Sequence, residues 1–224
     1  MKLRLSLLLL LVLVGTGCAS LNGARPLEPG KHEIATSIGG AMVMFAGAPV
    51  PLPNVIVEGR SGVAKPINRP LDINYGLNLT PMAFGILQFH VGTSWLLVHQ
   101  NGGIPALSMT NRIWFAANIL GAPFKAEGAV GVWANHQIEF TLSWEISHQL
   151  IYVSLAQYTD FTNPNLTLTP AIGAHFDPGK PGGFKLYVET RWYGLNQRQA
   201  ATPFTFVPNA LGALGLSFGF SYVL

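Results

Sequence analysis

Residues 137–147 read Gln-Ile-Glu-Phe-Thr-Leu-Ser-Trp-Glu-Ile-Ser, with an apolar side chain at every even position and a polar one at every odd position. The same alternation occurs at residues 71–79 and in the closing stretch 211–224, where Gly and Ser replace the charged residues on the polar side. A period of two is typical of a β-strand, because successive side chains point to opposite faces of a sheet. The sequence therefore predicts an all-β protein.

Weaker alternation marks seven further segments: 32–46, 54–62, 82–98, 105–117, 150–160, 166–176 and 183–194. Pro, Gly and Asn cluster between the segments, as they do in turns. We therefore expect about ten strands, with eight or twelve as alternatives, and a tight turn at Ser147-His148-Gln149. We expect outward-facing loops near 46–54, 120–135 and 196–209, and the last two are the longest irregular stretches of the chain.

Composition favours one of two all-β architectures, the transmembrane barrel over the soluble sandwich. Charged residues make up 10% of the chain and hydrophobic ones 49%, whereas globular domains carry about 25% charged residues. A soluble β-sandwich needs a polar outside, which this chain does not supply. The longest apolar run after residue 18 is 113–124 and contains Asn118, Gly121 and Pro123, so we expect no spanning helix. The composition favours an antiparallel, up-and-down transmembrane β-barrel with an apolar outside and a polar lumen.

Eight aromatic residues lie within the strand segments, several of them near strand ends, where a transmembrane barrel would need an aromatic girdle. They are Trp95, Trp114, Trp144, Trp192, Tyr152, Tyr187, Tyr193 and Tyr222.

The N-terminus has the pattern of a secretory signal. Lys2 and Arg4 precede an apolar run at 5–14, and Gly15-Thr16-Gly17-Cys18 follows with the only cysteine of the chain. This order of a basic head, an apolar stretch and small residues predicts a cleaved signal peptide, and the last four residues resemble a bacterial lipobox. That resemblance implies a signal peptide at 1–17, acylation (palmitate) of Cys18, a lipid-anchored segment at 18–30 and a barrel at 31–224.

Removing residues 1–17 also removes Lys2 and Arg4, which leaves 11 basic against 10 acidic residues. A chain so close to neutrality has no basic surface for nucleic acid, so we expect no nucleic-acid partner.

The closing strand, 211–224, carries the further resemblance. Its alternating aromatic residues and Tyr222 near the end are similar to the C-terminal assembly signal of small bacterial outer-membrane β-barrel proteins. The resemblance implies that the chain resides in the outer membrane, contacts outer-membrane lipids and is inserted by the outer-membrane assembly machinery. Ala19 after the cysteine is compatible with sorting to that membrane.

Charged residues fall on the less apolar faces of the expected strands. Facing lipid, an Arg or Lys at mid-plane would cost about 2–4 kcal/mol, so we expect these side chains to pair inside the lumen. The set is Asp72, Arg112, Glu139, Glu145, His175, Lys185, Glu189 and Arg191. It predicts either a plug of salt bridges or a functional lumen, with a selectivity lining or a ligand site. The plug is favoured because a barrel of this size has little free interior.

Catalytic and metal sites have weaker support. His90 and Ser94 share one face of a strand and are the best candidates for a base and a nucleophile. Four strand residues span about 13 Å, however, and the pair would need a hydrogen bond. Glu145 and His148 have a spacing that binds metal on a helix but lie on opposite faces of a strand. We therefore expect no catalytic residue, metal or cofactor.

The function that these features favour is non-enzymatic: an envelope structural protein of the outer membrane, or a narrow passage for small or apolar molecules. Two alternatives remain open at this point. One is an outer-membrane enzyme acting on lipid, and the other is a soluble periplasmic β-sandwich lipoprotein that binds a ligand or partner.

Overall fold

The computed structural model describes residues 23–83, 85–119, 132–161, 166–177, 183–198, 206–207 and 211–224. Its strands are β1 (His32–Phe45), β2 (Ala48–Pro51), β3 (Asn54–Ala64), β4 (Leu71–Asn78), β5 (Ile86–Val98), β6 (Ala106–Asn118), β7 (Val132–Ile146), β8 (Gln149–Asp160), β9 (Leu166–Phe176), β10 (Phe184–Arg198) and β11 (Leu211–Val223). Two short helical turns, η1 (Pro66–Asn68) and α2 (Leu79–Met82), connect strands. No helix in the described part of the chain is long and apolar enough to cross a membrane.

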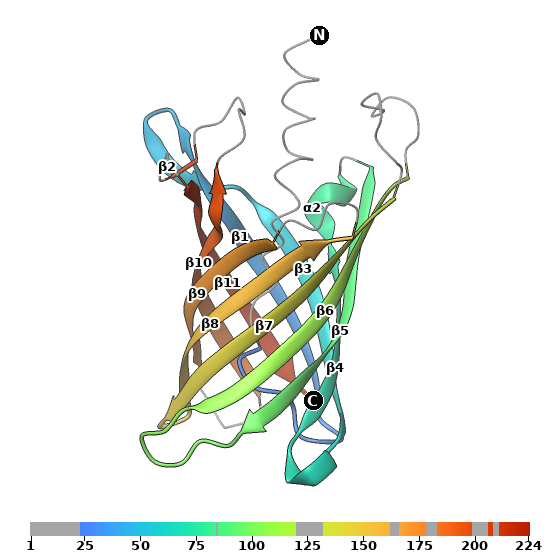
Figure 1. Ribbon diagram of the computed structural model, residues 1–224, viewed down its shortest axis with the longest axis vertical. Helices are drawn as coiled ribbons and strands as arrows, with labels where there is room; N and C mark the ends of the chain where they lie inside the picture. Colours follow the sequence, from blue (N-terminus) through green and yellow to red (C-terminus); the bar gives the residue numbers. More distant parts are fainter. Residues whose placement is uncertain are drawn as a thin grey trace.

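Ten of the strands close into a barrel (Figure 1). Each strand pairs antiparallel with its neighbours in chain order, and β11 also pairs with β1, from Glu33↔Val223 to Ala41↔Gly215. Closure leaves the ring without a free edge, as a sheet inside a bilayer requires. The predicted antiparallel barrel of about ten strands is confirmed, and the β-sandwich alternative is wrong because one sheet closes on itself. Among the described strands, β2 pairs with β1 alone and stands outside the ring.

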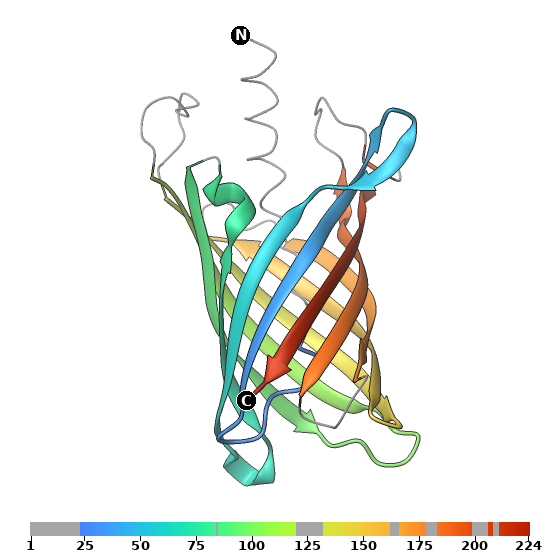
Figure 2. The ribbon, with the colours of Figure 1, turned by 180° about the vertical axis from the view of Figure 1, so that it is seen from behind.

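The two ends of the barrel differ (Figure 2). The C-terminus and η1 lie at one end, called here the terminal end, while α2 and the β1–β2 hairpin lie at the opposite loop end. At the terminal end β7 and β8 are joined by Ser147 and His148, whose φ angles are +48° and +66°. Two consecutive positive φ angles match a two-residue hairpin turn. The tight turn predicted there is confirmed.

Polar and apolar side chains separate between the two faces of the sheet. On β11, Ser217 is 2% exposed and Phe218 is 49% exposed. On β7, Glu139 is fully buried whereas Phe140 is 47% exposed. The buried side chains are the polar ones, so the chain places its polar faces in the lumen and its apolar faces outside. This inversion of the soluble pattern is what a bilayer requires of a barrel.

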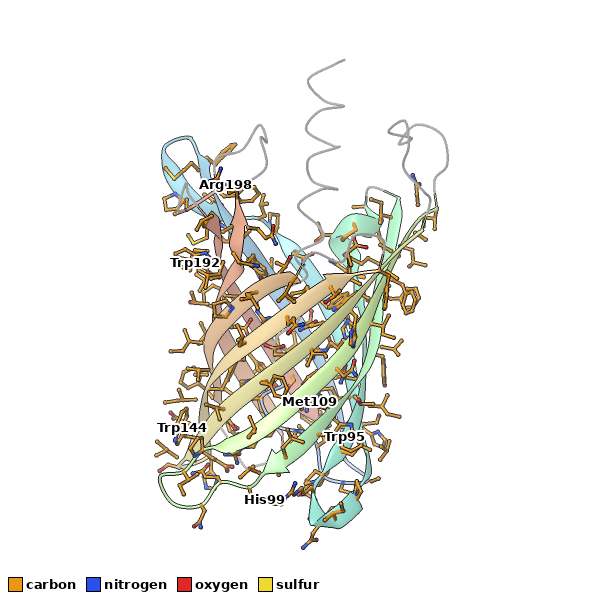
Figure 3. The ribbon with its side chains drawn as sticks, viewed as in Figure 1. Trp95, His99, Met109, Trp144, Trp192 and Arg198 are labelled. Atoms are coloured by element: carbon orange, nitrogen blue, oxygen red, sulfur yellow. The ribbon has the colours of Figure 1, made fainter. Side chains whose placement is uncertain are left out.

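The aromatic girdle is only partly as expected. Trp95, Trp144 and Trp192 lie on the outside of the barrel (Figure 3). Tyr222 is exposed as well. The girdle prediction is wrong for the other four, whose rings or hydroxyl groups are buried on the lumen side: Trp114, Tyr152, Tyr187 and Tyr193. The reason is strand parity, because Trp114 is in phase with Arg112, and Tyr187 is in phase with Glu189.

Several predicted boundaries also change. The stretch 46–54 contains β2, β7 already begins at Val132, and β10 continues to Arg198. The predicted strand at 82–98 begins only at Ile86, because α2 precedes it with Asn78 as its N-cap. The remaining parts of the other two predicted loops, 120–131, 199–205 and 208–210, lie outside the described residues.

The apolar outer face yields a prediction about depth. Ile172 is exposed near the middle of β9, and Ile146 is exposed at the terminal end of β7. In phosphatidylcholine vesicles, Ile172→Arg should lower the free energy of unfolding by about 2–4 kcal/mol, and Ile146→Arg by about 0–1 kcal/mol. Urea titration of both variants measures the difference. Equal losses would mean that the outer face of β9 does not face hydrocarbon.

Candidate functional site

The middle of the lumen holds a buried ion cluster. Nη2 of Arg191 lies 3.0 Å from Oε1 of Glu139, and Nε of Arg191 lies 2.8 Å from Oε1 of Glu189. All three side chains are at most 1% exposed. The hydroxyl of Tyr152 donates to Glu189 at 2.7 Å, and that of Ser154 donates to Glu139 at 2.7 Å. Because β8 and β9 separate β7 from β10, the Arg191–Glu139 pair crosses the lumen instead of joining adjacent strands.

A second arginine extends this cluster toward the opposite wall. Nε of Arg112 donates to Oδ1 of Asn74 at 3.1 Å, and Nη1 of Arg112 lies 4.0 Å from Glu139. Gln137 donates to the same carboxylate at 3.0 Å and accepts a bond from Nε1 of Trp114 at 2.8 Å. Buried charges need partners of this kind, since an unpaired one is far more costly than a satisfied pair. Side chains of β4, β6, β7, β8 and β10 thus form one connected network.

His90 and Glu58 approach each other on the β3–β5 side of the lumen. Nε2 of His90 lies 3.7 Å from Oε1 of Glu58, and the imidazole packs on the ring of Trp114 with centroids 4.3 Å apart. Gly76 is paired with both Glu58 and His90 and lies between them. A Cβ at Gly76 would come within 2.4 Å of the His90 ring, so glycine is what allows these two side chains to lean together.

Ser94 has its own partners. Its hydroxyl accepts from Nδ2 of Asn74 at 3.0 Å and from the hydroxyl of Thr110 at 3.1 Å. These contacts come from β4 and β6, and His90 contributes none of them. The candidate base and nucleophile therefore share a buried face without being joined, and both point into the lumen, away from lipid.

A third cluster occupies the terminal end of the lumen. Nη2 of Arg60 lies 2.6 Å from Oδ2 of Asp72, and Nη1 lies 3.5 Å from Oε2 of Glu33. Nζ of Lys185 is 3.9 Å from the same oxygen of Glu33, and the hydroxyl of Tyr187 donates to the other. Four strands, β1, β3, β4 and β10, thus converge on Glu33 and Arg60.

Residues 23–30, called here the terminal segment, fold back into this end of the barrel. The amide of Leu27 donates to Asp72 at 2.9 Å, and Arg60 donates to the carbonyl of Arg25 at 2.5 Å. Gly62 on β3 makes room for the chain, because a Cβ there would come within 2.0 Å of the carbonyl oxygen of Glu28. Ala24 and Leu27 are buried as a result. The terminal segment thus fills space in the mouth of the barrel.

The side chain of Arg25 reaches across the mouth to β7 and the β5–β6 turn. Its guanidinium bonds Glu145 at 2.7 Å, Ser143 at 3.0 Å and Gln100 at 2.5 Å. Partial burial lowers the pKa of Arg25, and the Glu145 carboxylate opposes that shift. The guanidinium therefore joins the terminal segment to the far wall.

A cavity of about 240 Å³ adjoins the terminal segment. It is lined by Gly23, Arg25, Pro26, Leu27, Arg60, Glu145, His148, Leu150, His175, Asp177 and Lys185. The lining includes cationic side chains, Arg25, Arg60 and Lys185, as well as anionic ones, Glu145 and Asp177.

The predicted lumen residues differ in how far they are buried. Six of them are buried on the lumen side: Asp72, Arg112, Glu139, His175, Glu189 and Arg191. Glu145 and Lys185 lie nearer the terminal-end rim, with side chains 49% and 26% exposed. The imidazole ring of His175 packs edge-on against the rings of Tyr152 and Tyr187, with ring centroids 5.2 and 4.3 Å apart.

Four charged contributors to these clusters lie outside the predicted set: Arg25, Glu33, Glu58 and Arg60. The sequence could have indicated Glu58 and Arg60, because they are in phase with each other in the alternating stretch 54–62. The sequence could not have indicated Arg25, because the terminal segment has no periodic pattern of polar and apolar residues.

A multi-ligand metal site does not appear among the described residues, since no three or more His, Cys, Asp or Glu side chains gather there in a way that would hold an ion. Glu145 and His148 instead flank the cavity at the terminal end.

Comparison with solved structures identifies the fold. An outer-membrane channel of Pseudomonas putida F1 is similar over 92% of this chain and 100% of its own, with a TM-score of 0.52 and 7% identity. The fold is that of an outer-membrane β-barrel. The translocator domain of the autotransporter NalP from Neisseria meningitidis also aligns, over 95% of this chain and 92% of its own, with a TM-score of 0.43 and 12% identity. The sequence matches no protein-family model and no curated protein.

The Arg60–Asp72 pair allows a matched test of burial. Asp72→Asn should lower the free energy of unfolding in vesicles by about 3–5 kcal/mol, because it leaves the buried Arg60 without its nearest carboxylate. Glu28→Gln removes a similar pair with Lys65, 3.0 Å long but exposed, and should cost about 0–1 kcal/mol. A loss below 1 kcal/mol for Asp72→Asn would show that the terminal-end cluster does not support the barrel.

Proposed function

We propose that this protein is a closed β-barrel lipoprotein of the bacterial outer membrane, with a non-enzymatic, structural role in the cell envelope. The observation that carries the proposal is the Arg191–Glu139 pair across the lumen. A pore needs a continuous aqueous path, whereas these two side chains meet at 3.0 Å in the middle of the described barrel.

The size of the barrel supports the same proposal. Eight strands enclose a space that side chains just fill, and ten strands enclose a cross-section about half as large again, which further side chains can occupy. Here Arg112, Gln137 and Trp114 extend the central network, and the terminal segment occupies part of the mouth. These contacts place side chains and backbone across the path that a solute would take along the axis, which supports a closed barrel.

The lipid anchor is the second part of the proposal. Cys18 lies outside the described residues, so its acylation rests on the lipobox-like residues before it. Gly23, the first described residue, packs against Arg60 at the terminal end. Five residues span at most about 17 Å, so an acyl chain on Cys18 would enter the leaflet facing that end. Outer-membrane lipids and the assembly machinery are then the proposed partners.

A narrow passage for small or apolar molecules is the second candidate. The cavity beside the terminal segment favours it, because displacement of that segment would enlarge this space toward the terminal end. A lipid-modifying enzyme is not proposed, since Ser94 and His90 face the lumen and lipid contacts the opposite face of their strand.

Complementation of a deletion strain tests the structural role. Loss of the protein should make cells sensitive to detergent, and both the wild type and Ser94→Ala should restore resistance, because no chemistry is required of the serine hydroxyl. Cys18→Ala should remain inserted, should lack acyl groups by intact mass, and should restore resistance less well. An altered envelope lipid profile in the deletion strain, restored by the wild type and not by Ser94→Ala, would contradict the proposal in favour of an enzyme.

A further inference from the structure

The contacts of Arg25 have the form of a binding site for a guanidinium group. Nη1 donates to Oε2 of Glu145, Nη2 to Oε1 of Gln100, and Nε to the hydroxyl of Ser143. Nη2 also approaches the carbonyl of Ser143 at 3.4 Å. A guanidinium presents its donors in a rigid plane, and the three residues offer acceptors to each of its nitrogens. Lysine, with one nitrogen on a flexible stem, would satisfy only part of this set.

The acceptor residues Gln100, Ser143 and Glu145 are called here the Arg25 socket. Hydrogen bonds that do not involve Arg25 hold this socket in place. Oε1 of Gln100 also accepts from the amide of Glu145 at 2.8 Å, while Nε2 of Gln100 donates to the carbonyl of Glu145 at 3.3 Å and to that of Gly102 at 3.4 Å. These contacts join the β5–β6 turn to the end of β7. The acceptors are therefore positioned before a guanidinium arrives, which reduces the ordering cost of binding.

The rest of the terminal segment is recognised mainly through its backbone. Asp72 accepts from the amide of Leu27, Arg60 donates to the carbonyl of Arg25, and Gly62 exchanges bonds with Gly30 and Lys31. Such contacts do not depend on which side chains the segment carries. The remaining side-chain ion pair of the segment, Glu28–Lys65, is exposed and contributes little. The Arg25 side chain is therefore the specific contact.

Exposure separates the Arg25 socket from the deeper clusters. The side chains of Arg25 and Glu145 are 23% and 49% exposed, whereas those of Arg60 and Asp72 are 7% and 0% exposed. Water can replace the partners of Arg25 when the guanidinium leaves. The side chains of Arg60 and Asp72 are too deeply buried for water to replace their partners if that pair were broken. The rim contact is thus the one that can open without breaking the barrel.

We propose that Gln100, Ser143 and Glu145 form a guanidinium site that Arg25 occupies as a latch, and that its release lets the terminal segment leave the mouth of the barrel. The inference goes beyond the structural role, since it depends neither on acylation nor on what the envelope requires. Opening would enlarge the adjoining cavity and expose the Arg60–Asp72 pair to the aqueous phase at the terminal end.

Thiol labelling in detergent micelles tests the latch. Leu27 is buried at the centre of the terminal segment, so Leu27→Cys reports its departure through the rate of reaction with a charged maleimide. Adding Arg25→Ala should raise that rate roughly tenfold or more, as expected when charge-assisted bonds are lost. Glu145→Gln should act in the same direction, and Arg25→Lys should give a smaller increase. The chain without Leu27→Cys gives the background from Cys18.

Two controls make the result decisive. Lys65→Ala removes the exposed ion pair of the same segment and should leave the Leu27→Cys rate unchanged. Ser154→Cys, in the buried lumen, should stay slow in the Arg25→Ala background. An Arg25→Ala rate equal to that of the parent would overturn the latch. So would a parallel rise at Ser154→Cys, because it would mean that the whole barrel had loosened.

Discussion

The buried pair between Arg191 and Glu139 is the interaction on which the rest of this barrel depends. A lipid-facing surface excludes charge, so the charged side chains of the strands must lie inside, where each needs a partner. Arg191 meets Glu139 across two intervening strands and Glu189 on its own strand. Arg112 and Gln137 then complete the surroundings of Glu139. Satisfying these charges places a connected set of side chains across the lumen between β4, β6, β7 and β10.

Two sets of contacts cross the lumen at different depths. The central cluster is made by strand residues alone and is almost fully buried. At the terminal end, the terminal segment adds buried backbone contacts to Asp72 and Arg60 and the partly exposed Arg25 side chain. An exposed contact such as that of Arg25 has lower local stability than a core contact. The terminal end is therefore where the described barrel can change shape.

The fold was predictable because alternation is a local signal. Residues 71–79, 137–147 and 211–224 show which side chains share a face without any knowledge of their neighbours, and the composition indicates that the apolar face meets lipid. Asp72, Glu139 and Ser217 are all buried as their parity requires. The prediction of an aromatic girdle was wrong for four residues because it gave more weight to their position near a strand end than to their parity along the strand. Trp114 and Tyr187 are in phase with lumen residues, and their polar groups bond Gln137 and Glu33 there.

The partners within the candidate site could not be predicted in the same way. Arg191 and Glu139 are 52 residues apart in sequence, and their contact depends on the register of four strands and on the stagger with which the barrel closes. Arg25 precedes the first strand and meets Glu145, 120 residues later, through a segment with no periodic pattern. Contacts of this type are decided by the three-dimensional arrangement, so only the residue types were visible beforehand.

Single-channel recording across a planar phosphatidylcholine bilayer tests the closed lumen most directly. Protein that migrates as a folded barrel on an unheated gel should give no conductance steps, whereas the combined Glu139→Ala, Glu189→Ala and Arg191→Ala variant, with Arg25→Ala to free the terminal segment, should give them. Stable steps from the wild-type barrel would contradict the account, because the ion pairs across its lumen could not then be closing it.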